Sequence, residues 1–403
     1  MSRPDLEKLE QAVTQHGNVL LYGPPGTGKT ELMRRFQESL EERETEREVS
    51  EEFNPDAIQT PFRTGDQINE DEDFPGEIRT EWLTFHESMS YSEFMLGLRP
   101  RPTGDGTELV PRAGTLLELA EHAQDGNTSV LFIDELNRAN VSEVFGQFIT
   151  AMEPEKRLAS DGSIRSSTVG ITLPQVDEGE SIRLPGGSDF DVEMPYYFPA
   201  NMYIVASMNS LDRSTAPLDS ALARRFEQIQ IRPDYKAFKQ HLTQNISSRS
   251  LNLDSDKPIE SLGSNPESVT PEALSLALLN QVNTFLRGAM GDDFQLGPGY
   301  LWRVGDVDED SQTRFNALVS AWDARVIPKL RELFRSRGDQ LELLLRPDGI
   351  SDFEEYPYSR TELTQRWERK GLTAPLETPP LAEQSNTVAR RTLHSIATQS
   401  AEE

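Results

Sequence analysis

The glycine-rich stretch VLLYGPPGTGKT at residues 19–30 constrains the fold of this chain more than any other part of its sequence. It satisfies the pattern G-x-x-x-x-G-K-[ST], in which glycines let backbone N–H groups turn toward phosphates without a Cβ in the way. Lys29 would neutralise the β- and γ-phosphates, and the hydroxyl of Thr30 can ligate Mg²⁺. The expected nucleotide-binding residues of this stretch are Gly23, Pro24, Pro25, Gly26, Thr27, Gly28, Lys29 and Thr30.

The residues on either side of this stretch have the pattern that a phosphate loop requires. Residues 19–22 form a short apolar run typical of a buried strand, and apolar residues recur at helical spacing after Lys29. Further strands are expected at 82–85, 130–133, 202–207 and 226–231, with helices between them. This alternation predicts an α/β fold with a parallel sheet and helices on both faces. The alternative for residues 23–28 is a glycine turn that binds nothing.

Two adjacent acids follow the buried run at 130–133. Asp134 and Glu135 would lie beside the phosphate loop, because ligands of parallel sheets bind at the carboxyl ends of the strands. Asp134 can hold Mg²⁺, and Glu135 can orient or deprotonate the attacking water. The alternative is an acidic N-cap for the next helix, but two acids directly after VLFI favour catalysis.

Polar residues also follow the next strand. Asn209 stands where its amide can reach the γ-phosphate or the water, whereas Asp212 belongs either to the nucleotide site or to a helix cap. Arg224 and Arg225 follow on a helix, and their always-cationic forks suit the charge of a phosphoryl-transfer transition state. The alternative for the two arginines is a surface pair that offsets acidic neighbours.

Composition limits the partners and the compartment. The net charge is −28, with 8 lysines among the 40 basic residues, and such an acidic surface repels nucleic acid on average and stays soluble in high salt. Two explanations of this net charge are considered, adaptation to a salty cytoplasm and the ordinary acidity that other proteins also have. The absence of cysteine excludes disulfides and thiolate metal sites. The polar start has no signal-peptide pattern, and no apolar run approaches the roughly 18 residues of a membrane span, so a cytoplasmic protein is expected.

The pattern along the chain predicts two domains. Residues 1–233 would form the α/β domain, with an acidic insertion at 41–79 and hairpin insertions at 97–114 and 156–198. Residues 234–346 show helical periodicity alone and predict a smaller helical domain. Residues 347–403 would be a tail or a peripheral cap.

Several segments together resemble AAA+ ATPases, and within them the McrB-type NTPase subunits of methylation-dependent restriction systems. They are GPPGTGKT, TFHESMSYSEFMLGLRP, FIDELNRANVSEVFGQFITAMEPEKR, ANMYIVASMNSLDRSTAPLDSALARRF, FQLGPGYLW and WDARVIPKLRELF. The resemblance implies a P-loop AAA+ core followed by a smaller all-helical lid domain, assembled into hexameric rings. It assigns Lys29 and Thr30 to the Walker A motif, Asp134 and Glu135 to the Walker B motif, and Asn209 to sensor 1. Arg224 and Arg225 match arginines that reach a neighbouring subunit's nucleotide.

The resemblance also implies Mg²⁺, a nucleotide and partners. ATP is favoured as the substrate, because most AAA+ proteins use ATP. GTP is the alternative, because McrB-type proteins use GTP. A separate McrC-like nuclease subunit is the expected partner, and a MoxR-like chaperone that remodels a protein complex is the alternative. A scaffold that binds nucleotide without hydrolysing it is a third reading, which the full set of motif residues disfavours.

Two departures from the family pattern affect these expectations. Few residues precede the first strand, where the restriction subunits carry a DNA-recognition domain, so DNA would be met only indirectly or through pore loops. The two hairpin insertions match those of the clade with MoxR-type and dynein-like proteins, and their residues Arg99, Arg101 and Arg112 would line or flank the pore. Near LGPGYL no clear sensor 2 arginine appears, and Arg287 and Arg303 are the candidates.

Overall fold

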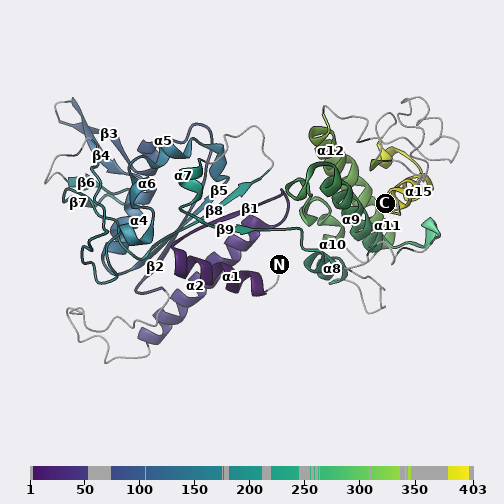
Figure 1. Cartoon of the computed structure of the whole chain (residues 1–403), viewed down its shortest axis with the longest axis horizontal. Helices are drawn as coiled ribbons and strands as arrows, with labels where there is room; N and C mark the ends of the chain where they lie inside the picture. The colour runs from purple at the N-terminus through teal and green to yellow at the C-terminus, as the bar shows by residue number, and fades with distance from the viewer. Residues whose placement is uncertain are drawn as a thin grey trace. The chain divides into compact units, whose positions relative to one another are not determined.

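The computed structural model describes residues 3–52, 74–104, 106–174, 176, 181–210, 219–244, 255, 258, 262, 264–307, 310–335, 341, 344–345 and 380–398. The chain divides by its contacts into two compact units (Figure 1). The α/β unit comprises Ser2–Tyr22 and Lys29–Gln230, and the helical unit comprises Gly23–Gly28 and Ile231–Glu403. The phosphate loop therefore groups with the helices, although it connects a strand and a helix of the α/β unit.

A five-stranded sheet forms the centre of the α/β unit. The pairs β1 with β9, β2 with β5 and β5 with β8 are parallel, which confirms the predicted parallel sheet. The strand order is β2 (Ile78–Thr84), β5 (Thr128–Asp134), β8 (Met202–Asn209), β1 (Asn18–Gly23) and β9 (Glu227–Gln230).

Side chains of β5 alternate between the two faces of this sheet. Phe132 packs edge-on against Phe36 of α2, with ring centroids 6.0 Å apart, whereas Leu131 and Ile133 join the cluster that includes Leu116 of α4. Figure 1 shows α1 and α2 on one side of the sheet and α4 on the other. A strand buried on both faces reads as one apolar run, which is why residues 130–133 predicted it. The helices are α1 (Arg3–His16), α2 (Lys29–Glu52), α3 (Tyr91–Phe94), α4 (Thr115–Gln124), α5 (Val141–Phe145), α6 (Phe148–Ala151) and α7 (Ser220–Ala223).

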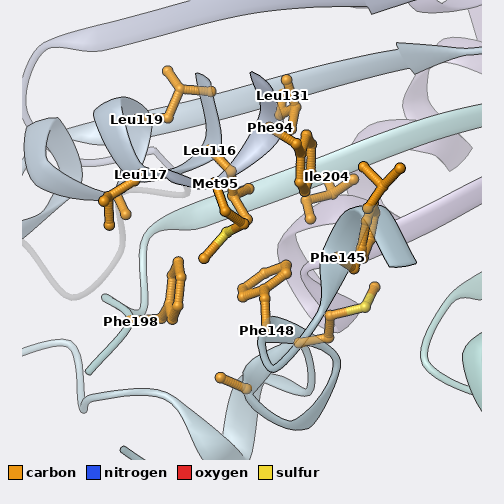
Figure 2. Packing of buried hydrophobic residues seen from close by; sticks show 14 of the residues in the cluster. Phe94, Met95, Leu116, Leu117, Leu119, Leu131, Phe145, Phe148, Phe198 and Ile204 are labelled. Carbon is orange, nitrogen blue, oxygen red and sulfur yellow. The ribbon is translucent and has the colours of Figure 1, made fainter. Parts of the chain in front are cut away.

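Apolar residues recur at helical spacing across residues 141–152, but the helix is broken at Gly146. This glycine has φ of 54°, and a Cβ there would lie 2.7 Å from the ring of Tyr91. The break separates α5 from α6 and lets both contribute aromatic rings to one cluster (Figure 2). Phe145 stacks on Phe94 with centroids 4.7 Å apart, and Phe148 contacts Phe198 at 4.4 Å.

The two predicted hairpin insertions form a single second sheet. The first insertion is the hairpin of β3 (Leu96–Thr103) and β4 (Gly106–Ala113), and the second contributes β6 (Ser181–Arg183) and β7 (Asp189–Asp191). Arg112 of β4 pairs in parallel with Arg183 of β6, and this pair joins the insertions.

Arg157, at the start of the second insertion, is a buried cation that ties three elements together. Its guanidinium donates to the backbone oxygens of Ala151 and Met152 near α6, to Met202 of β8, and to Oδ1 of Asn18 in β1. The side chain is 0% exposed, and burial lowers its pKa to about 10. This residue therefore belongs to the core, although the sequence predicts a hairpin insertion from residue 156 onward.

The described helices and short turns of the helical unit share one apolar core. Leu278 and Val282 of α9 share this core with Phe315, Leu330 and Leu393. The helices are α8 (Tyr235–Thr243), α9 (Pro271–Met290), α10 (Arg303–Asp306), α11 (Ser311–Ala321), the π-helix η7 (Trp322–Val326), α12 (Ile327–Leu333) and α15 (Asn386–Ala397). Short 3-10 turns of the chain are η2 (Leu136–Arg138), η3 (Pro154–Lys156), η4 (Pro266–Ser268), η5 (Asp292–Phe294), η6 (Pro298–Tyr300) and η9 (Leu381–Glu383).

Two expectations about chain organisation need correction. The expected acidic insertion at 41–79 is not a separate segment at its ends: α2 continues through Glu52, and β2 begins at Ile78, while residues 53–73 lie outside the described part. Within the expected tail at 347–403, α15 packs its buried face against α9, so this helix is part of the core. Its apolar residues recur at helical spacing, so the sequence does contain the pattern of this helix. None of the helices in the described ranges has an apolar stretch long enough to cross a membrane.

Candidate functional site

Polar residues at the start of one helix and at the ends of two strands of the α/β unit meet in one hydrogen-bonded cluster. Lys29 starts α2 directly after the phosphate loop, Asp134 ends β5 and is followed by Glu135, and Asn209 ends β8. The sequence predicted that these residues come together, because parallel strands end at the same edge of a sheet.

Asn209 lies at the centre of the cluster. Its Oδ1 accepts a hydrogen bond from Nζ of Lys29 at 2.8 Å, and its Nδ2 donates to Oε1 of Glu135 at 2.9 Å. An amide can accept from a cation through its oxygen and donate to a carboxylate through its nitrogen, and these partners also fix which way it points. Asn209 therefore holds the positions of Lys29 and Glu135 relative to each other.

Asp134 forms a second branch of the cluster. Its Oδ1 accepts from the hydroxyl of Ser207, and its Oδ2 accepts from Oγ1 of Thr30 at 3.2 Å. A carboxylate next to a threonine hydroxyl at the start of a helix supplies the hard oxygen ligands that Mg²⁺ prefers. These two residues therefore fit the metal that the sequence predicted. Ser207 was not predicted, although it occupies the strand position two residues before Asn209.

Glu135 has an unusual backbone. Its φ is 57°, and among the residues that the structure describes it is the non-glycine residue with positive φ. The left-handed conformation costs about 1–3 kcal/mol where surrounding contacts enforce it, and such strain concentrates at functional sites. The side chain lies between Asn209 and Arg138, whose Nε is 3.5 Å from Oε2. The strained turn thus points the carboxylate into the cluster and away from a helix-cap position; no side-chain cap hydrogen bond forms at Glu135.

Lys29 is buried, with 6% of its surface exposed. Burial disfavours the ammonium and is the largest influence on its pKa, while Glu135 and Asp134 act in the opposite direction; together they lower the pKa of Lys29 to about 8. The ammonium of such a lysine would be strongly stabilised by a polyanion, because phosphate oxygens replace the water that burial removed.

The phosphate loop has the backbone that its glycines predicted. Gly26 and Gly28 have φ of 76° and 91°, and Oγ1 of Thr27 donates to the carbonyl of Pro24 at 3.0 Å. A Cβ at Gly23 would lie 2.3 Å from the carbonyl oxygen of Ile231. Side chains at these glycines would clash or strain the loop, so the pattern requires glycine for steric reasons.

A contact to the phosphate loop was missed by sequence reasoning. Within the helical unit, Gly297 N–H donates to the Pro25 carbonyl at 2.9 Å, and Gly299 N–H donates to the Gly26 carbonyl at 3.0 Å. The segment LGPGYL contains no arginine, and its two glycines are the sequence signal for this contact. The two sensor 2 candidates have other surroundings. Arg287 pairs with Asp292 at 3.3 Å, and Arg303 is exposed at the start of α10.

The two predicted arginines after α7 differ in their surroundings. Arg224 is exposed, whereas Arg225 donates to the carbonyl of Ala221 and places its Nε 3.4 Å from Oε1 of Glu153. The side chain of Arg225 is 12% exposed, so its contacts lie within its own unit. Asp212, the remaining predicted site residue, lies outside the described ranges.

Comparison with known proteins decides the family. Residues 18–226, more than half of the chain, match the family described as AAA domain, dynein-related subfamily. The chain belongs to this AAA family. The match begins at Asn18 of β1 and ends at Phe226, so it contains every predicted site residue from Gly23 to Arg225. The sensor 2 candidates Arg287 and Arg303 lie outside it.

Two curated relatives of this AAA domain are restriction proteins. The Type IV methyl-directed restriction enzyme EcoKMcrB subunit of Escherichia coli K12 is 30% identical over 232 residues, which are 57% of this chain and 38% of that protein. The Type II restriction enzyme BsuMI component YdiS of Bacillus subtilis 168 is 26% identical over 242 residues, 55% of this chain and 59% of that protein. The chain spans about half the length of these relatives. The resemblance to McrB-type AAA+ proteins that the motifs predicted is confirmed.

Proposed function

We propose that this AAA domain is a Mg²⁺-dependent nucleoside triphosphatase that cleaves the bond between the β- and γ-phosphates. The observation that carries the proposal is the bridge made by Asn209 between Lys29 and Glu135. It couples the cation expected at the γ-phosphate to the acid expected at the attacking water.

Each residue of the cluster has a distinct role in this proposal. The loop at residues 23–28 and Lys29 bind the phosphates, and Thr30 and Asp134 hold Mg²⁺, which supplies positive charge to the phosphate oxygens. Glu135 orients the water and accepts its proton, while Asn209 keeps the carboxylate in place. ATP is the proposed substrate and GTP the alternative.

Turnover by the purified chain tests this function directly. Hydrolysis of ATP and of GTP is measured with Mg²⁺, with and without the product of the neighbouring gene. Glu135→Gln keeps the shape and the hydrogen bond from Asn209 but cannot accept a proton, so turnover should fall by at least about 100-fold while nucleotide binding persists. Glu155→Gln, at an exposed acid of η3, is the matched control. Normal hydrolysis by the Glu135→Gln chain would refute the assigned base.

We further propose that the chain acts as a ring, hexameric as in the family it resembles, with Arg224 reaching the nucleotide of the next subunit. Support comes from the exposure of Arg224 beside the internally bound Arg225. In this proposal the ring drives a separate McrC-like nuclease subunit, because the relatives are named as components of restriction enzymes. DNA would be contacted indirectly or through the arginines of the hairpin. Of these, Arg101 pairs with Glu108 of the same hairpin at 3.2 Å, so DNA would compete with this carboxylate.

The second candidate is a MoxR-like remodeller of a protein complex. The net charge of −28 favours this candidate, because an acidic chain repels DNA on average. Capture with a tagged Glu135→Gln chain, which should hold its partner in the nucleotide-bound state, separates the two. A nuclease subunit in the complex supports the restriction function, and a client protein without nuclease supports remodelling.

A further inference from the structure

The segment Leu296–Tyr300, which we call the loop brace, contacts the phosphate loop through backbone atoms. Gly297 and Gly299 donate their N–H groups to the carbonyls of Pro25 and Gly26, two consecutive residues of the loop. The contact is close: a Cβ at Gly297 would lie 1.9 Å from the carbonyl carbon of Gly26 and 2.2 Å from the nitrogen of Thr27. Only glycine permits this approach.

The two hydrogen bonds fix the direction of two loop N–H groups. In a trans peptide the carbonyl and the following N–H point in opposite directions. Because the carbonyls of Pro25 and Gly26 point at the brace, the N–H groups of Gly26 and Thr27 point away from it. These are amides of the kind that cradle phosphates in such loops.

The brace is itself held by Asn283, a fully buried side chain of α9. Asn283 accepts from the N–H of Leu296 at 2.6 Å and donates to the carbonyl of Leu296 at 2.8 Å, which fixes the backbone just before Gly297. It also donates to the hydroxyl of Tyr235 at 2.9 Å, and its exposure is 0%. On the other side of the brace, Leu301 is buried in the helical core. The brace therefore has a rigid support at both ends.

We propose that the loop brace, positioned by Asn283, preorganises the phosphate loop and so sets the affinity for nucleotide. Neither the brace nor Asn283 touches reacting atoms, so they are positioning residues. The inference rests on the proposed nucleotide function, since it concerns the same loop. Preorganisation raises affinity because the loop amides need no reordering when phosphate arrives.

Glycine substitutions in the full chain test the brace in a graded way. Gly297→Ala places a methyl group inside the loop backbone, and Gly299→Ala places one 3.0 Å from the Gly26 carbonyl oxygen, a milder clash. Gly288→Ala is the matched control, because a Cβ there meets nothing within 4 Å and the residue is an exposed helical glycine of α9. Dissociation constants are measured by titration with a fluorescent ATP and a fluorescent ADP analogue, and circular dichroism confirms the fold.

Affinity for both nucleotides should fall about 10-fold or more in Gly297→Ala, less in Gly299→Ala, and not at all in Gly288→Ala. ATP and ADP should be affected equally, and kcat at saturating nucleotide should change within about twofold, because the brace acts on binding. Unchanged affinity in Gly297→Ala would overturn the brace while leaving the proposed function intact. If the unaltered chain binds neither nucleotide, both proposals fail. If Gly297→Ala does not fold, the Gly299→Ala result decides: equality with Gly288→Ala overturns the inference.

Discussion

At the scale of single residues, Lys29 combines a charge requirement with an environment that opposes its charge. Burial lowers its pKa to about 8, so at neutral pH it is a cation, and above pH 8 the empty site increasingly holds a neutral amine. Phosphate binding needs the cation and raises the pKa again. Nucleotide binding is therefore linked to proton uptake above pH 8.

The nucleotide dissociation constant should rise as pH increases through about 8, approaching about tenfold per pH unit until the pKa of the bound state is reached. Titration of nucleotide from pH 7 to 9.5 measures this rise, and calorimetry in buffers of different ionisation enthalpy measures the proton uptake. In Lys29→Ala the residual affinity should lack this dependence. A flat profile for the unaltered chain would show that the lysine stays charged throughout.

The sequence predicted the residues of the cluster because each stands in a contiguous motif after an apolar strand. No distant contact has to be known to predict Lys29, Asp134, Glu135 and Asn209, because parallel strands end at the same edge of a sheet. Asn283 could not be found this way, because its partners are backbone atoms of a turn whose position depends on the packing of α9. The difference between Arg224 and Arg225 likewise depends on Glu153, which is far from them in sequence.

At the scale of elements, Arg157 shows how one side chain can join pieces that the sequence separates. It lies at the start of the hairpin insertion expected at 156–198, but its guanidinium is shared by β1, β8 and the end of α6. The fork of an arginine spreads five donors over three nitrogens and so reaches acceptors on separate elements, whereas the three donors of a lysine ammonium all lie on one atom.

Arg157→Lys should lower the free energy of unfolding by about 2–4 kcal/mol, because buried carbonyls lose their donors. Urea denaturation of the full chain, followed by fluorescence, measures the change. Arg165→Lys provides the comparison, since Arg165 is an exposed residue of the same insertion and should change stability by less than about 0.5 kcal/mol. Equal effects of the two substitutions would mean that the buried hydrogen bonds contribute little.

The types of the elements were predicted more reliably than the breaks between helices and the pairing of strands. The apolar runs gave the strands of the central sheet, and periodicity gave most helices. The break at Gly146 was hidden because the apolar stripe continues on both sides of it, while the glycine fits against Tyr91. Pairing of β4 with β6 brings together residues far apart in sequence, and local patterns contain no information on such pairing.

At the scale of the whole molecule, the proposed ring predicts complementation between defective chains. A Lys29→Ala chain lacks a working site of its own but keeps Arg224 for its neighbour, and an Arg224→Ala chain has the opposite defect. Each alone should lose about 100-fold or more in turnover, and mixed rings should regain activity where a sound site meets a sound arginine. Turnover measured across mixing ratios tests this expectation.

Arg225→Ala serves as the contrasting variant in the same experiment. Because Arg225 contacts Glu153 and Ala221 of its own unit, its loss should lower the melting temperature and should not be repaired by mixing. Repair of Arg225→Ala, without repair of Arg224→Ala, would exchange the roles of the two arginines.

The hold of Asn283 on the segment before Gly297 has a consequence for genetics. A screen for inactive alleles would be expected to recover changes at positions 283 and 297 beside those in the glycine-rich stretch. Those products that fold would have every recognisable motif intact, and raised nucleotide concentration should suppress their phenotype. Such alleles would separate weak substrate capture from failed chemistry in the living cell.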